Sequence, residues 1–489
     1  MVGTRLIERI RRAPLGPRSC VVVAALCVAL FATALGASTA EAARGLRTGF
    51  TDNFLFDASS PHPSGRELWL ERAKSARAGI IRLTVDWRQT TRNKPTHPAN
   101  PADPAYGFGR LDAAVRSVKR KGLDVLLSVH RAPPWFEGAH PPRGIKPGAW
   151  KPNPVAYGQF GKALARRYSG HFQDLPRVRY FEVWSEPNLT QFLAPQWKRK
   201  RAFAPKRYRQ LLNHLYAGVH KVQRKATVIA GATSPFGDPR KHQLYPGHPR
   251  MQPMVFLRTV LCLNHKLRRA RKCKPKPHLD AVSTHPINLE HGPRYKSHDK
   301  NDSQVANFSR VRKMVKRAKR AKTIRPKGRK QLWVTESGFL SNPPNPNGVR
   351  PKKHARWVAE GIYLLWKQGA SVVLNLNLRD PAYDPKHVPS GQWTTGIYFH
   401  SGLPKPALKA FKFPFVTHRK SAKTVKAWGT APVGGKVQIQ QKRHGQWRTR
   451  KRFNVGPGQV FNKSIRVRGR ATLRARVGTT TSNLSPESR

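Results

Sequence analysis

The chain has 489 residues, of which 93 are Lys or Arg and only 24 are Asp or Glu, giving a formal net charge of +69. A charge of this size favours anionic partners, such as acidic polysaccharides or anionic cell-envelope polymers. The charge is spread along the whole chain and no nucleic-acid-binding module is recognisable, so the composition argues against a dedicated nucleic-acid-binding protein.

Residues 1–42 have the pattern of a secretory signal peptide. Five arginines form a positively charged region, which is followed by an apolar run from Cys20 to Leu35. The sequence Ala40-Glu41-Ala42 then provides a small-residue cleavage site. The apolar run is shorter than the about 20 residues that a membrane span requires, and no second such run follows. We therefore expect a secreted, extracellular protein without a transmembrane span after cleavage, associated with the cell wall through its charge. A retained N-terminal anchor is the alternative.

Between residues 45 and 411, short β-branched runs alternate with longer amphipathic runs. Strands are expected over residues 48–56, 80–85, 124–129, 178–184, 227–232, 279–284, 331–335 and 371–376. Helices are expected over residues 111–121, 155–168, 208–222, 256–267, 305–322 and 355–366. This order predicts an α/β fold, a (β/α)8 TIM barrel over residues 43–417. A doubly wound open sheet shares the alternation but usually has a Gly-rich loop after its first strand, and residues 53–60 form none.

The pattern changes in the C-terminal region, residues 418–489. Strand-like runs at residues 425–428, 436–441, 447–453, 460–467 and 472–477 are separated by Gly, Pro and basic turns, without a helical period. We expect a small all-β sandwich domain. Trp428 and Trp447 could stack on a sugar ring, or they could belong to the core of the sandwich.

Two cysteines remain after signal cleavage, Cys262 and Cys273. An oxidising compartment would allow a disulfide that closes this short loop and contributes about 2–3 kcal/mol. Two free buried thiols are the alternative. No second Cys/His pair stands at ligand spacing, so no zinc or other metal site is expected.

Two glutamates follow apolar strands. Glu186 lies in the run Val183–Asn188 after the fourth strand, and Glu336 lies in Leu332–Phe339 at the end of the seventh. In a TIM barrel, chemistry takes place at the carboxyl ends of the strands, and cleavage of a glycosidic bond requires two carboxylates. Either glutamate alone could be a solvated or ion-paired carboxylate. The pair indicates catalysis, because only 24 acidic residues are distributed over the chain.

Both motifs resemble those of clan A of the retaining glycoside hydrolases. The stretch Tyr180–Leu189 resembles family 39, and family 5 is the nearest alternative. The resemblance covers the whole barrel in order. It implies that Glu186 is the acid/base and Glu336 the nucleophile of a retaining glycosidase that acts on a β-linked poly- or oligosaccharide. It also implies that the enzyme needs no cofactor.

Further strand-end residues fit the resemblance as substrate-binding or positioning groups. Arg82 matches an arginine that would lie beneath the nucleophile, and His130 and His285 match histidines that line such clefts; a structural hydrogen-bonding role is the alternative for each histidine. Trp135 and Trp393 lie in loops after strands three and eight, where exposed indoles would stack on sugars unless they pack under the loops.

Three positions depart from the family pattern. Ser185 replaces an Asn that would bind the sugar 2-hydroxyl, no Tyr follows His285, and Asn375 stands where a Trp is usual. These departures favour the alternative hypothesis, a non-catalytic glycan- or envelope-binding protein on a degenerate barrel. Because the residues that contact sugar have changed, the family's sugar specificity cannot be transferred to this chain.

Overall fold

The computed structural model describes residues 45–58, 65–199, 201–239, 249–386 and 393–486. The predicted signal peptide lies outside these residues. In the described part of the chain, no helix combines the length and the apolar character that crossing a membrane requires.

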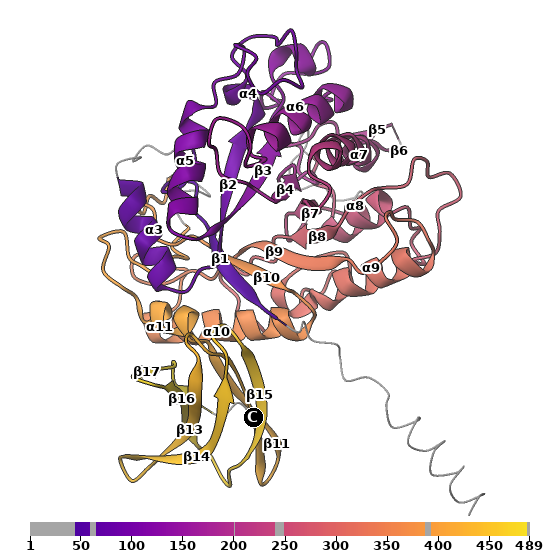
Figure 1. The fold of residues 1–489 in the computed structure, drawn as a ribbon. Coiled ribbons are helices and arrows are strands. Elements are labelled where there is room, and N and C mark those ends of the chain that lie inside the picture. Colours follow the sequence, from indigo (N-terminus) through magenta and orange to yellow (C-terminus); the bar gives the residue numbers. More distant parts are fainter. Residues whose placement is uncertain (1–44, 59–64, 200, 240–248, 387–392, 487–489) are drawn as a thin grey trace, which may run out of the picture. The chain divides into compact units, whose positions relative to one another are not determined.

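Eight parallel strands close into a barrel in the order β1-β10-β9-β8-β7-β4-β3-β2 (Figure 1). The strands are β1 (Arg47–Thr51), β2 (Ile80–Asp86), β3 (Asp124–His130), β4 (Tyr180–Val183), β7 (Thr227–Thr233), β8 (Ala281–Thr284), β9 (Gln331–Ser337) and β10 (Val372–Leu376). The first and last strands pair in parallel, β1 with β10. The TIM barrel prediction is therefore confirmed, and an open sheet is excluded.

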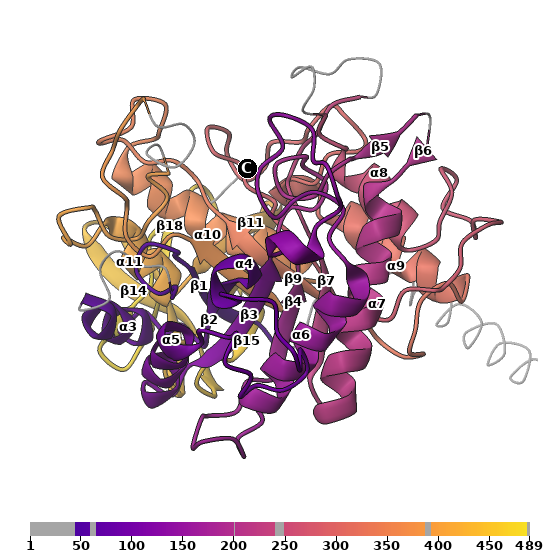
Figure 2. The ribbon, with the colours of Figure 1, turned by 90° about the horizontal axis from the view of Figure 1, so that it is seen from above.

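Helices lie around the ring of barrel strands in Figure 1, and Figure 2 shows the same helices from above. They are α3 (Arg66–Ser75), α4 (Trp87–Thr90), α5 (Gly109–Arg120), α6 (Pro154–Arg167), α7 (Ala204–Val222), α8 (Pro253–Val260), α9 (Ser309–Arg320), α10 (Pro351–Lys367) and α11 (Pro406–Lys412). The single-turn helices η2 (Pro134–Phe136) and η3 (Val305–Asn307) and the short hairpin of β5 (Trp197–Lys198) and β6 (Arg201–Ala202) lie in the connections.

Two predicted elements continue well past the residue at which the structure ends them. The first strand ends at Thr51 rather than residue 56, because the Asp52 side chain accepts the Leu55 backbone N–H at 3.2 Å and closes a turn. Helix α8 ends at Val260 rather than residue 267, because Cys262 adopts a left-handed conformation with φ of 58°. Cys262 and Cys273 form a disulfide that closes the loop beyond this helix.

The barrel interior has an apolar layer and a polar layer. Seven buried residues from six strands fill the part of the barrel nearest the amino ends of its strands: Ile80, Leu126, Ile229, Ala281, Trp333, Val372 and Leu374. Inward positions recur every second residue along a strand, so Arg82 and Ser128 lie one step above Ile80 and Leu126. Charged side chains therefore begin where the apolar layer ends, near the carboxyl ends of the strands.

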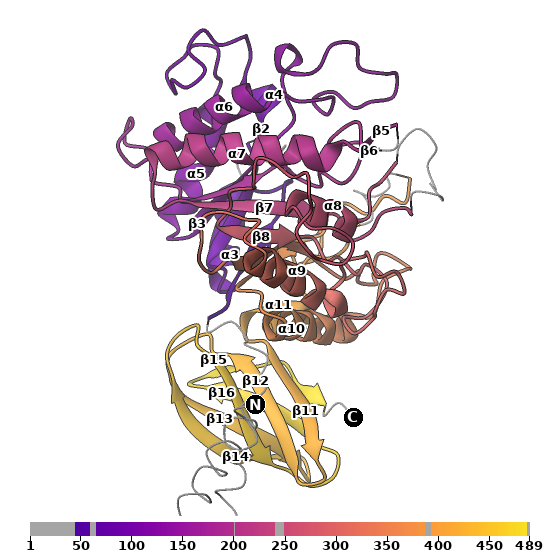
Figure 3. The same ribbon diagram turned by 90° about the vertical axis from the view of Figure 1, so that its right-hand side faces the viewer.

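The C-terminal region forms two antiparallel sheets around a separate core (Figure 3). One sheet has the order β11-β12-β15, and the other has the order β14-β13-β16-β17 with β18 paired to β16. The strands are β11 (Phe415–Ser421), β12 (Thr424–Thr430), β13 (Gly435–Arg443), β14 (Gln446–Val455), β15 (Val460–Arg466), β16 (Thr472–Val477), β17 (Thr480–Thr481) and β18 (Ser485–Pro486). The predicted all-β fold is confirmed, and the first of these strands was missed.

The two tryptophans of this region are engaged within the protein. Trp428 is fully buried, and its ring lies 5.2 Å from that of Tyr363 and 5.5 Å from that of Trp366 on α10. The guanidinium of Arg474 lies 4.0 Å from the ring of Trp447. Trp428 is therefore a packing residue and offers no face for a sugar.

Candidate active site

Arg82 is the centre of the polar layer. Its side chain is only 1% exposed and donates four hydrogen bonds: to Glu182 at 2.7 Å, to Glu336 at 2.9 Å, to Ser128 at 2.9 Å and to Ser185 at 3.1 Å. A buried guanidinium is tolerated only when carboxylates and other acceptors surround it. The structure thus places Arg82 directly against Glu336, where the sequence predicted it.

Glu182 was missed by the sequence analysis. It is completely buried in β4, where one oxygen accepts from Arg82 and the other accepts from the Ser283 hydroxyl at 2.8 Å. A signal existed in the sequence, because Glu182 is an acidic residue inside an apolar strand, and parallel strands are buried on both faces. In the structure it lies on the same face of β4 as Tyr180, which packs against Trp333 of the inner apolar layer. A carboxylate at an inward position requires a buried cation, and Arg82 is that cation.

Glu186 follows a turn with unusual backbone geometry. Trp184 and Glu186 both have positive φ, 65° and 43°, and Ala232 on the neighbouring strand has φ of 45°. The backbone N–H of Glu186 donates to the Ala232 carbonyl at 2.8 Å, which fixes the turn against β7. Left-handed conformations at non-glycine residues cost about 1–3 kcal/mol each and are concentrated at functional sites. The strain here directs the Glu186 side chain to the barrel mouth.

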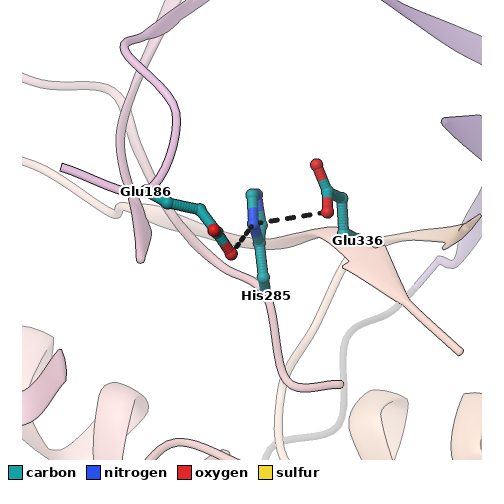
Figure 4. Close-up of side chains that lie close together, drawn as sticks. All are labelled: Glu186, His285 and Glu336. Carbon is teal, nitrogen blue, oxygen red and sulfur yellow. Dashed lines mark hydrogen bonds and ion pairs between the residues drawn. The ribbon is translucent and has the colours of Figure 1, made fainter. Parts of the chain in front are cut away.

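The imidazole of His285 lies between the two predicted catalytic glutamates (Figure 4). Its Nδ1 lies 3.1 Å from a carboxylate oxygen of Glu186 and 3.6 Å from one of Glu336. One oxygen or nitrogen atom from each of the three residues lies within 4.8 Å of the other two. The ends of β4 and β9 therefore bring both carboxylates to one place, with the His285 imidazole between them.

Burial and charge act against each other at these groups. Burial raises the pKa of Glu336, although the charges of His285 and Arg82 oppose the increase. Burial would lower the pKa of His285, but the charge of Glu336, followed by the hydrogen bond and charge of Glu186, outweighs burial and raises this pKa. Burial likewise disfavours ionised Glu182, yet Arg82 above all lowers the pKa of that carboxyl. A protonated His285 is thus stabilised between the two carboxylates.

The other departures have structural explanations. The Ser185 hydroxyl accepts a hydrogen bond from Arg82, and the residue is 8% exposed. Ser185 therefore helps to hold the guanidinium that binds the carboxylates. The Asn375 amide donates to the backbone carbonyls of Asn377 at 2.9 Å and Thr395 at 3.0 Å. Asn375 therefore fixes the segment after β10 through its side-chain amide.

The remaining predicted residues lie on the rim. His130 ends β3, and its ring lies 6.2 Å from that of Phe192; burial lowers the pKa of His130 to about 3, so its ring is neutral. Trp135 lies in η2, where its ring contacts Phe136 edge-on at 6.5 Å. Trp393 is partly exposed, and its carbonyl accepts from Asn377 at 3.4 Å. None of these three contacts Glu186 or Glu336 in the interactions of the described residues.

The cluster of Glu186, His285 and Glu336 also has the composition of a metal site. However, Arg82 already neutralises Glu336, and the raised pKa of His285 favours its protonated form, which cannot bind a metal. The donor set therefore fits a proton-transfer site better than a site for a divalent cation.

The fold and the carboxylate cluster define a class of protein, a TIM barrel with paired glutamates at the ends of its fourth and seventh strands. No family model matches the sequence, and no curated protein matches it. Solved structures do resemble it. A family 39 glycoside hydrolase from the gut symbiont Bacteroides cellulosilyticus WH2 aligns with a TM-score of 0.51 and 16% identity, over 87% of this chain and 81% of the other. A glucosidase from Croceicoccus marinus aligns with a TM-score of 0.50 and 13% identity, over 85% and 82%. At this identity the likeness establishes the fold alone.

Proposed function

We propose that the protein is a retaining glycoside hydrolase that cleaves β-linked poly- or oligosaccharides. The observation that carries the proposal is the cluster in Figure 4, in which carboxylate oxygens of Glu186 and Glu336 lie within 4.8 Å of each other across the barrel mouth. Retaining enzymes hold their carboxyl groups about 5–5.5 Å apart, whereas inverting enzymes leave about 6.5–9.5 Å for a water molecule. The short spacing supports retention of configuration.

The contacts support different roles for the two glutamates. Glu336 attacks the anomeric carbon, and Arg82 compensates its charge from below. Glu186 donates its proton to the departing oxygen, and a glycosyl-enzyme results. In the second step Glu186 removes a proton from water, and the water oxygen attacks the anomeric carbon. The bond from this carbon to Glu336 breaks, which releases the sugar with retained configuration. His285 contacts both carboxylates and can stabilise whichever of them is ionised at each stage.

The test uses aryl glycosides with good leaving groups. Glu336→Ala should abolish turnover, because no group remains to form the covalent intermediate. Glu186→Ala should still form the intermediate, since a good leaving group needs little protonation, but should release it slowly for lack of a base. Azide, which needs no base, should restore turnover of this variant and give a glycosyl azide of retained configuration.

Three further measurements address metal dependence, the Ser185 substitution and the non-catalytic alternative. Wild-type turnover should persist in EDTA, because no metal takes part. Ser185→Asn should keep the roles of both glutamates and should raise turnover if a lost 2-hydroxyl contact limits the enzyme. A wild-type protein that binds glycans but hydrolyses none of a broad panel would instead establish the non-catalytic alternative.

We also propose that the protein is exported and is held at an anionic cell envelope. The signal-peptide pattern of residues 1–42, the net charge of +69 and the Cys262–Cys273 disulfide support this location, because disulfides persist in oxidising compartments. N-terminal sequencing of the protein from the culture medium should give Ala43 as the first residue. Recovery of the uncleaved chain from the membrane fraction would indicate a retained anchor.

A further inference from the structure

A cavity of about 670 Å³ lies at the carboxyl ends of β2 and β3. Its wall includes Thr84, Asp86 and His130, which are the last inward residues of these two strands. Thr84 follows Arg82 by two residues on the same face of β2, a step of about 7 Å. Because Arg82 binds Glu336, the cavity opens at the same end of the barrel as the candidate active site, one inward step beyond Arg82 on β2.

Three arginines from three different segments line this cavity: Arg92, Arg110 and Arg131. Arg131 is compensated by Asp86, at 3.3 Å. In the described part of the chain, Arg92 and Arg110 form no ion pair, and both are exposed. The cavity therefore carries uncompensated positive charge at the end of the barrel that holds the candidate catalytic pair.

The acidic groups of the cavity do not cancel this charge. Asp86 is engaged with Arg131 and accepts the Gln89 backbone N–H at 3.0 Å. Asp57 is buried and accepts the Thr84 backbone N–H at 2.7 Å. Burial raises the pKa of Asp57 to about 7, so this carboxyl is only partly ionised near neutrality.

The backbone adds further donors. Helix α5 begins at the cavity, with Gly109, Arg110 and Leu111 in its wall, and no side chain caps this end of the helix. The first N–H groups of a helix point out of its end and favour an anion. The His130 ring also lines the cavity, and its buried Nδ1 has no hydrogen-bond partner among the described residues.

A glycine makes room for one of the arginines. A Cβ atom added at Gly107 would lie 2.6 Å from Nε of Arg92, too close for the guanidinium to stay in place. The missing side chain at position 107 therefore lets Arg92 lie in the cavity wall. This contact supplies a variant that moves Arg92 without removing its charge.

We infer that this cavity, named here the arginine cavity, binds an oxyanion-bearing sugar residue of the glycan whose cleavage is proposed above, on which this inference rests. Paired N–H groups of arginine match the two oxygens of a carboxylate or sulfate. A neutral sugar would leave Arg92 and Arg110 without a partner. The substrate class is thus an acidic glycan, such as a uronate polymer or a sulfated polysaccharide.

The test compares ligands that share one sugar backbone and differ in whether it carries carboxylates, sulfates or neither. Binding of β-linked tetraglucuronate, of cellotetraose, which is its carboxyl-reduced counterpart, and of sulfated cellotetraose is measured by calorimetry on the Glu336→Gln protein. At least one charged ligand should bind about tenfold or more tightly than cellotetraose, as a charge-assisted hydrogen bond predicts. The tighter of the two identifies carboxylate or sulfate as the recognised group.

Variants locate the preference. Arg92→Gln combined with Arg110→Gln should reduce the affinity for the charged ligand to the level of cellotetraose, and Gly107→Ala should weaken it partly. Lys316→Gln with Arg317→Gln on α9, an exposed basic pair outside the cavity, is the matched control and should retain the preference. Equal affinity for charged and neutral ligands, or equal losses in both double variants, would overturn the inference. Calorimetry needs no turnover, so an absence of hydrolysis by the wild type would count against the proposed function only.

Discussion

The barrel interior around Arg82 and the C-terminal sheets use positive charge in opposite ways. Arg82 is 1% exposed, and Glu182 and Glu336 hold it. Between Phe415 and Pro486 the chain contains 17 Lys and Arg and no Asp or Glu. A buried cation requires carboxylate partners, whereas a solvated one is stabilised by water and screened by salt.

The difference separates charges that are held in place by ion pairs from charges that only add to the positive electrostatic potential around the protein. A chain with 24 acidic residues places two of them against one buried arginine and a third, Glu186, close by across His285. The C-terminal sheets have no such arrangement in their described residues. Substitutions inside the barrel should therefore alter stability and chemistry, while substitutions on the sheets should alter only association with polyanions.

The largest effect is expected for the buried arginine. Arg82→Met should lower the free energy of unfolding by about 3–5 kcal/mol, because it removes the cation that binds both Glu336 and the fully buried Glu182. Arg476→Met is the matched control on β16, where the exposed side chain donates to the Gly478 carbonyl, and should change stability by less than about 0.5 kcal/mol. Urea unfolding followed by tryptophan fluorescence measures both. Similar losses for the two variants would contradict the comparison.

A second effect concerns the barrel's disulfide. Replacing Cys262 and Cys273 by Ser opens a loop with a sequence separation of 11 residues and should cost about 2–3 kcal/mol. The same loss should appear in the wild type under a reducing agent, and the double Ser variant should be insensitive to that agent. A wild type whose unfolding midpoint does not change on reduction would show that the loop is held by its other contacts.

The third effect depends on pH. The raised pKa of His285 means that its protonated form stabilises the folded state. This contribution should be complete below pH 6.5, the ordinary value, and should disappear as pH increases through the higher pKa of the folded state. It amounts to about 1.4 kcal/mol for each tenfold increase in proton affinity. The difference in unfolding free energy between wild type and His285→Gln is measured from about pH 5 to about pH 9, a range that includes the ordinary pKa of histidine. This difference should decrease on the alkaline side. A difference that is constant over this range would show that His285 acts only by packing.

The smallest effect on stability is expected for the C-terminal sheets. Replacing the exposed Arg448, Lys451 and Arg452 of β14 by Gln should leave the unfolding free energy within about 0.5 kcal/mol. The variant should elute from an immobilised anionic cell-wall polymer at lower salt than the wild type, because screening shortens the range of the field. Retention of the protein that is independent of salt would indicate recognition of a specific receptor instead of general electrostatic attraction.

Much of the fold followed from local patterns. The eight barrel strands were predictable because parallel strands buried on both faces are short β-branched runs, and alternating helices cover them. Element ends were less predictable, since Asp52 and Cys262 end their elements through a side-chain hydrogen bond and a left-handed residue. The polar strand ends identified Glu186, Glu336, Arg82 and His285 as neighbours, because the carboxyl ends of barrel strands meet at one face.

The sequence by itself determined the barrel, the two-carboxylate motif and the excess of positive charge, because each depends on composition or on a period along one segment. Only the tertiary structure decided which groups touch. It placed His285 between the two glutamates, paired Glu182 with Arg82, and joined the Asn375 amide to backbone carbonyls of Asn377 and Thr395. It also brought Arg92, Arg110 and Arg131 around one cavity. Such contacts join residues far apart in the chain, and the closure of the barrel sets their distances.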